Sequence, residues 1–310
     1  MEYVGIQTQQ SRNNIHSLLL LVFFPLIVLA LTFAFCALFV FFDGASSAEL
    51  WGRAFGFFCD AAPWVFGAVM LWFAVAYFAN VGILARAVRS KPLERGENKR
   101  VYNLLENLCM SQGMPMPGLM VIEDGSLNAF ASGVDSRSYT VTLTRGIMEK
   151  LDDAELEGVI AHELSHIRNR DVRLMIVSIV FVGIFEMVAL MALRAAPRVR
   201  GKNSGGAVVM LLIVAALAGI GALCSTLLHF GISRKREYLA DAGAAEMTRN
   251  PLGLASALRK ISGNPRVAAA EGNSRIARLF IESPAASGKS AGLFDSHPPV
   301  ERRIEILEQF

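Results

Sequence analysis

The sequence is poor in charge and in cysteine, and these shortages exclude several classes of protein. Charged residues make up 18% of the 310 positions, and the formal net charge is only +3. A balance this close to neutral gives no basis for binding an anionic polymer, so we expect no nucleic-acid partner. The four cysteines form no CxxC pair, which argues against a disulfide framework or a cysteine metal site.

The missing charge is concentrated in four long apolar stretches. Residues 18–42, 63–85, 174–193 and 207–232 contain one charged side chain among them, Glu186. Each stretch reaches the roughly 20 residues that a helix needs to cross a bilayer. The first is too long for the apolar part of a signal peptide, and no small-residue cleavage site follows it. We therefore expect a multi-pass membrane protein with two firm spans and a later hairpin that crosses fully or is partly embedded.

Basic residues predict which way the chain is oriented. Between the first two stretches, Arg53 is the single cation against three acidic residues, whereas Arg86, Arg89, Lys91 and Arg95 follow the second stretch. Because cytoplasmic loops carry the excess of Lys and Arg, the polar part after residue 85 is expected in the cytoplasm.

The polar part has the pattern of an α+β domain. Helical spacing covers residues 96–112, and strand-like pieces at 119–122, 128–131 and 139–144 predict a small antiparallel sheet. From Asp153 the helical pattern continues through Asp171 directly into the third apolar stretch. Short helices are expected at 251–262 and 299–310. The predicted organisation is a membrane region at 1–92, the first part of a polar domain at 93–171, a hydrophobic helical hairpin at 172–232 and the second part of that domain at 233–310.

The motif that carries chemistry is His162-Glu163-Leu164-Ser165-His166. In a helix, residues i and i+4 project from the same face, so both imidazoles can bind one Zn²⁺. The intervening Glu163 can reach a zinc-activated water as a general base. The motif lies in a stretch with an apolar side, as a packed helix requires.

A third zinc ligand is predicted from the geometry of the hairpin. The turn between the third and fourth apolar stretches is centred near residue 200, so residues at equal height have numbers that sum to about 400. His162 and His166 then face residues near 238 and 234, and Glu237 lies there within one helical turn. Asp241 is one turn further, on the same face, and is predicted to accept a hydrogen bond from a ligand histidine as an outer carboxylate.

These motifs together resemble a known family. HELSHIRNRD, SRKREYLADAGA, NAFA at 128–131 and SHPPVERRI at 296–304 are similar to the HtpX-type integral-membrane zinc metalloproteases, relatives of the CAAX prenyl endopeptidases. The resemblance implies a mainly α membrane protein with a cytoplasmic zincin-like α+β domain, in the bacterial inner membrane. It implies His162, His166 and Glu237 as ligands of one Zn²⁺ and Glu163 as general base.

The same resemblance implies roles for residues outside the metal site. His297 would lie near the active site as a catalytic residue. His297 and Tyr238 are the two candidates for the group that donates a hydrogen bond to the oxyanion. Asn128 and Ala129 would belong to an unpaired edge strand that holds substrate. The implied function is endopeptidase cleavage of membrane proteins in quality control. Two alternatives remain open: a CAAX-type prenyl-peptide protease, and a non-enzymatic membrane scaffold with a structural zinc.

Overall fold

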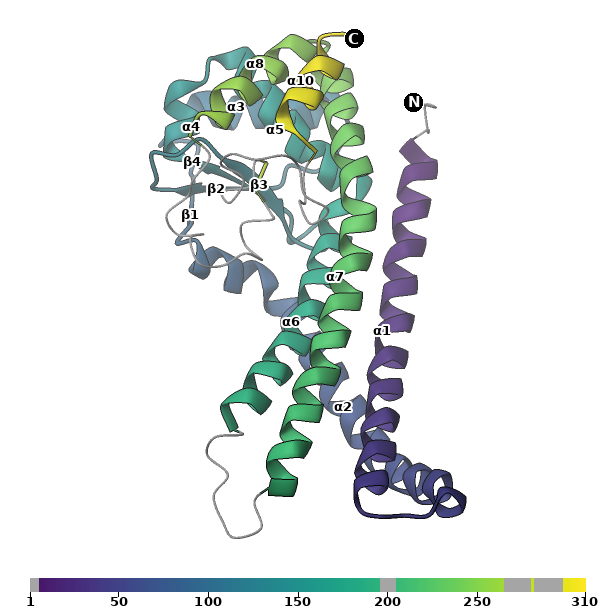
Figure 1. Cartoon of the computed structure of the whole chain (residues 1–310). Coiled ribbons are helices and arrows are strands. Elements are labelled where there is room, and N and C mark those ends of the chain that lie inside the picture. The colour runs from purple at the N-terminus through teal and green to yellow at the C-terminus, as the bar shows by residue number, and fades with distance from the viewer. Residues whose placement is uncertain (1–5, 196–204, 265–279, 282–297) are drawn as a thin grey trace. The chain divides into compact units, whose positions relative to one another are not determined.

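The computed structural model describes residues 6–195, 205–264, 280–281 and 298–310. Side chains are not described at several helical positions, including 224–235. The described part of the chain is mostly helical, with one small sheet (Figure 1), and the chain divides into two compact units. The first unit comprises residues 1–14, 79–176 and 230–310, and the second comprises 15–78 and 177–229. The predicted four-part domain boundaries stay a prediction.

The sheet of the first unit is mixed, not wholly antiparallel as expected. Its strands are β1 (Lys91–Pro92), β2 (Gly118–Ile122), β3 (Ala129–Ser132) and β4 (Thr140–Thr144), in the order β1-β2-β4-β3. β2 and β4 pair in parallel, whereas β1–β2 and β3–β4 are antiparallel. The β3–β4 hairpin places β4 beside β2 and leaves β3 at the edge. The sequence predicted β2, β3 and β4 but not β1, and it could not give the order of the strands.

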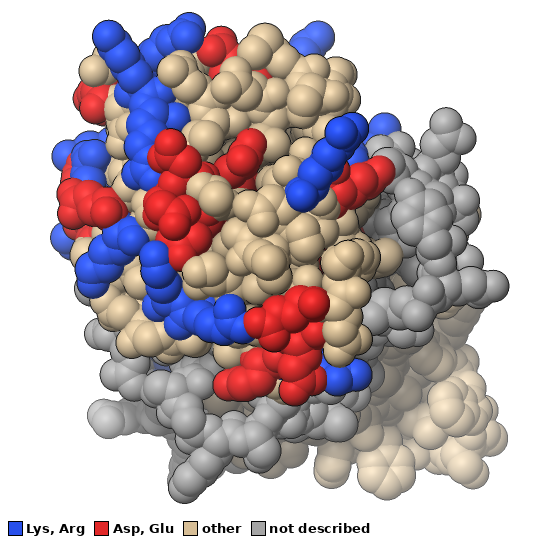
Figure 2. Space-filling model, turned by 90° about the horizontal axis from the view of Figure 1, so that it is seen from above, with Lys and Arg blue, Asp and Glu red and all other residues tan. Residues whose placement is uncertain are grey.

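Helices gather over one side of this sheet (Figure 1). They are α3 (Lys99–Ser111), α4 (Arg145–Lys150), α5 (Asp153–Asn169), α8 (Pro251–Ser262) and α10 (Val300–Leu307). On the face seen in Figure 2, groups of basic and acidic side chains of the described residues lie beside one another. The charged residues there keep the surface polar while the apolar sides of the helices pack inward.

Helix α5 begins and ends with clear capping signals. Asp152 and Glu155 form a capping box in which each side chain accepts a hydrogen bond from the other's backbone N–H. The helix ends at Arg170, which has a left-handed backbone with φ of 61°. A second helix, α6 (Asp171–Ala195), starts at the next residue. The predicted continuous helix from 153 into the third apolar stretch is therefore wrong at one residue, Arg170.

Helix α5 is the centre of the first unit, because it contacts α3, α8, β3 and β4. Its close approach to α8 depends on Gly158, where an added Cβ would lie only 2.8 Å from the backbone nitrogen of Leu254. Leu156, Val159 and Ile160 of α5 are fully buried. This packing places the HExxH helix between the sheet and the neighbouring helices.

The second unit consists of the apolar parts of four long helices. They are α1 (Ile6–Phe42), α2 (Ser47–Ala87), α6 and α7 (Gly205–Thr248). Two described segments, Val22–Phe42 and Ser47–Val75, are long and apolar enough to span a membrane, and Val208–Leu223 is a shorter apolar helix. Trp64 and Phe78 are each 82% exposed, an apolar surface that suits lipid better than water. Glu186 is exposed on α6.

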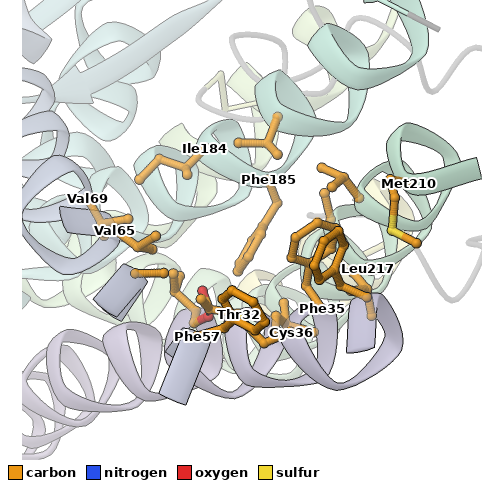
Figure 3. A pocket seen from close by; sticks show the side chains of 17 residues that line it. Thr32, Phe35, Cys36, Phe57, Val65, Val69, Ile184, Phe185, Met210 and Leu217 are labelled. Carbon is orange, nitrogen blue, oxygen red and sulfur yellow. The ribbon is translucent and has the colours of Figure 1, made fainter. Parts of the chain in front are cut away.

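An apolar cavity of about 720 Å³ lies among the helices of this second unit (Figure 3). Phe35, Phe57, Phe185 and Leu217 are among the side chains that line it. Thr32 also faces it, but its hydroxyl donates to the carbonyl of Val28 at 2.8 Å. The lining is therefore almost wholly apolar, as expected for helices in a bilayer.

We predict that Gly158→Ala destabilises the first unit, because the new methyl group overlaps the α8 backbone. Overpacking of this kind costs about 1–3 kcal/mol in free energy of unfolding. The measurement is the unfolding midpoint of the full chain in detergent by circular dichroism. Gly82→Ala on α2 is the matched control, since its Cβ would meet nothing within 4 Å. Equal midpoints for the two variants would contradict the close packing of α5 on α8.

Candidate metal centre

Three side chains of the first unit converge on one point. His162 and His166 from α5 have their Nε2 atoms 3.2 Å apart, and Glu237 from α7 places its carboxylate oxygens 3.7 Å and 3.6 Å from these two atoms. All three ligand atoms lie within 4.8 Å of one another. Ligand atoms bound tetrahedrally at 2.0–2.1 Å from Zn²⁺ lie about 3.3–3.4 Å apart, so the spacing suits this ion.

Two outer carboxylates orient the histidine rings. Asp241 lies 3.0 Å from Nδ1 of His162, and Asp171 lies 3.2 Å from Nδ1 of His166. A carboxylate accepts only, so each Nδ1 carries the proton and each Nε2 keeps its lone pair for a cation. Asp241 lies beside His162, and its role as an outer carboxylate stays a prediction. The sequence analysis did not single out Asp171 for such a role, although it stands only five residues after His166.

The break between α5 and α6 explains how Asp171 reaches the site. Arg170 turns the chain, so that Asp171, the first residue of α6, folds back toward the last turn of α5. A continuous helix would place Asp171 five residues beyond His166, which is about 140° away around the helix axis. The left-handed residue therefore supplies the second outer carboxylate.

Burial and charge act on the two histidines in opposite directions. Burial lowers the pKa of His162 to about 4, despite the hydrogen bond to Asp241. Burial also disfavours protonated His166, but the hydrogen bond to Asp171 and the charge of Glu237 outweigh it and raise the pKa to about 9. The negative surroundings that attract a proton to His166 also attract a metal cation.

The buried charges of the cluster also fit a divalent cation. Two guanidinium groups, from Arg236 and Arg303, are buried beside four carboxylates, those of Glu163, Asp171, Glu237 and Asp241. With both imidazoles neutral, four negative charges against two positive charges leave an excess of two negative charges. One Zn²⁺ balances that excess, which buried groups otherwise could not keep without cost.

Glu163 is buried on α5, next to His162, and its charge contributes to the raised pKa of His166. It thus lies close enough to the two imidazoles for electrostatic contact. This position agrees with the expected location of a general base, whose function stays a prediction.

The edge strand β3 is not unpaired, in contrast to what the sequence led us to expect. The N–H of Ile281 donates to the carbonyl of Ala129 at 2.9 Å, and Phe280 packs edge-on against Phe130. Asn128 and Ala129 are fully buried. Strand β3 and the segment 280–281 are far apart in sequence, so no local pattern signalled this contact.

The structure describes one of the two predicted oxyanion donors and adds a buried arginine. His297 lies outside the described residues. Tyr238 is half-buried on α7, next to Glu237. Arg303 on α10 is a fully buried residue of the cluster that the sequence analysis did not single out. Its signal was present in the segment SHPPVERRI, which was noted only as part of a resemblance.

Glu237 reaches the histidines because α7 approaches α5 closely. A Cβ added at Gly243 of α7 would lie 2.5 Å from Oγ of Ser165 on α5. Ala240 and Ala244, on the same helix, are fully buried. Small residues at this crossing let the two helices meet, and the metal centre forms one to two turns away.

The three side chains form a candidate His-His-Glu metal site, a ligand combination that catalytic zinc sites of hydrolases use. The sequence profile of Peptidase family M48 matches residues 95–310. Among curated relatives, the Protease HtpX homolog of Bacteroides fragilis is 54% identical, with all of both chains covered. That of Tropheryma whipplei is 40% identical over 76% of this chain and 80% of its own. A solved structure, Ste24p of S. mikatae, is 20% identical and covers 78% of this chain and 56% of its own, with a TM-score of 0.48.

The chain belongs to peptidase family M48 and is a metalloprotease with apolar helices suited to a membrane. The resemblance noted from the sequence motifs is thereby confirmed.

We predict that Glu237→Gln weakens zinc binding more than a change in an outer carboxylate, because it removes a charged ligand. The expected loss of affinity exceeds the roughly 10–100-fold effect of outer substitutions. The measurement is chelator competition on the purified full chain. Glu246→Gln is the matched control, because Glu246 is an exposed carboxylate of the same helix. Equal affinity in the two variants would remove Glu237 from the ligand set.

Proposed function

We propose that this chain is a zinc-dependent endopeptidase that cleaves membrane proteins, in the quality control of the bacterial inner membrane. The observation that carries the proposal is the convergence of His162, His166 and Glu237 with their lone pairs facing one point. In the described residues three protein ligands converge. A structural zinc site is normally closed by four ligands, whereas a catalytic site keeps one position for water or substrate. This difference argues against the scaffold alternative.

The proposed chemistry divides between the ion and the protein. Zn²⁺ bound by these residues would supply a Lewis acid that polarises the scissile carbonyl and lowers the pKa of water toward about 7. Glu163 takes the proton from the attacking water and passes it to the leaving amine. Asp171 and Asp241 hold the imidazoles in the tautomer that binds metal. Tyr238 and His297 are the candidates for the donor that stabilises the oxyanion.

Substrate binding would follow from the position of β3. This strand lies at the sheet edge and contacts α5, which carries the HExxH motif. A peptide that adds to β3 near Asn128 and Ala129 would bind mainly through its backbone, which implies loose sequence specificity. Since the carbonyl of Ala129 accepts from Ile281, such a peptide has to displace the 280–281 segment.

The chain is proposed to be a multi-pass membrane protein whose metal site faces the cytoplasm. The basic residues that follow the second apolar stretch support this orientation. Asp171 contacts His166 and begins α6, and the third apolar stretch starts three residues later. The metal ligands are therefore close in sequence to an apolar helix. This connection favours substrates that are membrane proteins or their loops near the bilayer.

We predict that Glu163→Gln abolishes peptide cleavage while it retains stoichiometric zinc. Loss of a general base lowers kcat by about 10²–10⁴-fold, and the amide keeps the size of the side chain. The measurement combines cleavage of a model membrane protein in detergent with metal analysis of the same preparation. Glu157→Gln, on the same helix and half-buried, is the matched control. Full activity in Glu163→Gln would end the proposed mechanism.

The alternative of a prenyl-peptide protease has its own test. A protease for prenylated C-termini gains transition-state binding from the lipid group, so its kcat/KM for the prenylated peptide is higher than for the same peptide without the lipid. We predict a preference of less than about tenfold for this chain, since the β3 edge recognises backbone. The measurement is kcat/KM for the matched pair of peptides in one detergent. A much larger preference would replace the proposed substrate class.

A further inference from the structure

We propose that Arg303 is a positioning residue of the metal centre, which sets zinc affinity by holding Asp241 against His162. This inference rests on the proposed zinc function. Arg303 belongs to α10, and its side chain is 0% exposed. It is among the largest fully buried side chains of the described residues, and it is charged. Such a residue requires specific partners, because an unpaired buried charge is strongly unfavourable.

The partners of Arg303 that carry the inference belong to the candidate metal centre. Its Nε and Nη2 donate to the two oxygens of Asp241 at 2.9 Å and 2.7 Å, a bidentate pair. Nη2 also lies 3.5 Å from both ring nitrogens of His162, and Nη1 lies 3.7 Å from a carboxylate oxygen of Glu237. The guanidinium group thus contacts an outer carboxylate and approaches two of the three ligands.

The geometry gives Asp241 a defined orientation. Its Oδ1 atom accepts hydrogen bonds from Nη2 of Arg303 and from Nδ1 of His162, the latter at 3.0 Å. The planar fork of Arg303 fixes the plane of the carboxylate, and the carboxylate in turn fixes the imidazole. Nη1 of Arg303 also donates to the carbonyl of Ile281 at 3.1 Å. The guanidinium group is therefore held on both sides, which makes it a rigid support.

The second histidine has a similar but looser support. Asp171 contacts His166, and Nε of Arg236 lies 3.4 Å from the other oxygen of Asp171. This distance is longer than those of the bidentate pair of Arg303. Each ligand histidine thus contacts a carboxylate that is paired with an arginine, and the distances between arginine and carboxylate are shorter on the His162 side. We therefore place the positioning function in Arg303.

The neighbouring Arg302 provides a matched control. Its side chain is 60% exposed and pairs on the surface with Glu305, at 2.7 Å. Exposed pairs of this kind contribute about 0–1 kcal/mol, so its loss should leave the site unchanged. The two arginines share a helix, a size and a charge, and they differ in burial and partners.

The experiment measures zinc affinity by chelator competition on the full chain in detergent. Arg303→Met is expected to weaken zinc binding about 10–100-fold, the usual effect of losing an outer partner of a ligand histidine. Arg302→Met is expected to stay within about threefold of wild type. Because Arg303 acts through Asp241, the double variant Arg303→Met, Asp241→Asn should bind zinc within about threefold of Asp241→Asn alone.

Several results would overturn the inference. The first is a zinc affinity of Arg303→Met within about threefold of wild type. The second is a double variant whose loss of affinity is the product of the two single losses, because independent residues give additive free energies. If Arg303→Met does not fold, Arg303→Lys decides, because it keeps the charge and removes the fork. We expect it to lose more than about threefold in affinity, with Arg302→Lys unchanged, and equal affinities would refute the positioning function.

The outcomes also separate this inference from the proposed function. A wild-type chain that binds no zinc contradicts the proposed function itself. A second outcome has three parts: the wild-type chain binds zinc, Glu237→Gln loses zinc affinity, and Arg303→Met binds zinc as tightly as wild type. This outcome contradicts only the positioning function. Zinc affinity is a readout independent of peptide cleavage, so a defect in substrate binding cannot imitate the result.

Discussion

The structure of the first unit depends on one electrostatic constraint: two imidazole nitrogens face each other at 3.2 Å inside a buried cluster with two more carboxylates than guanidinium groups. Buried excess negative charge is unfavourable, and it contributes to the raised pKa of His166. A divalent cation bound between the two nitrogens would balance this charge in place of a proton. The packing of α5, α7, α10 and the start of α6 around this point follows from the need to bring ligands and outer partners together.

The support for the ligands comes from segments far apart in the chain. His162 and His166 belong to α5, Glu237 and Asp241 to α7, and Arg303 to α10. An outer carboxylate determines which ring nitrogen carries the proton, and therefore which one binds metal. The C-terminal helix is thus connected to the ligands through a single guanidinium group. The same group donates to Ile281, which links the metal centre to the residues paired with β3.

The two units contrast in chemistry. In the first, buried polar groups form a network around the site, and many exposed side chains are charged. In the second, the described cavity lining is almost wholly apolar, and large aromatic side chains such as Trp64 are exposed. Water favours the first surface and lipid the second. Helices α6 and α7 belong to both units, so each connects part of the metal centre to an apolar segment of the same helix.

The sequence by itself determined the features that depend on local periodicity and on spacing along a helix. These are the apolar helices, the HExxH face of α5, and the approximate height of Glu237 and Asp241 in the hairpin. Only the tertiary structure decided the parallel pairing of β2 with β4, the left-handed turn at Arg170 that brings Asp171 to His166, the pairing of Ile281 with Ala129, and the burial of Arg303. Each of these depends on a chain reversal or a long-range contact, and no local residue pattern encodes which distant segment will fill a given place.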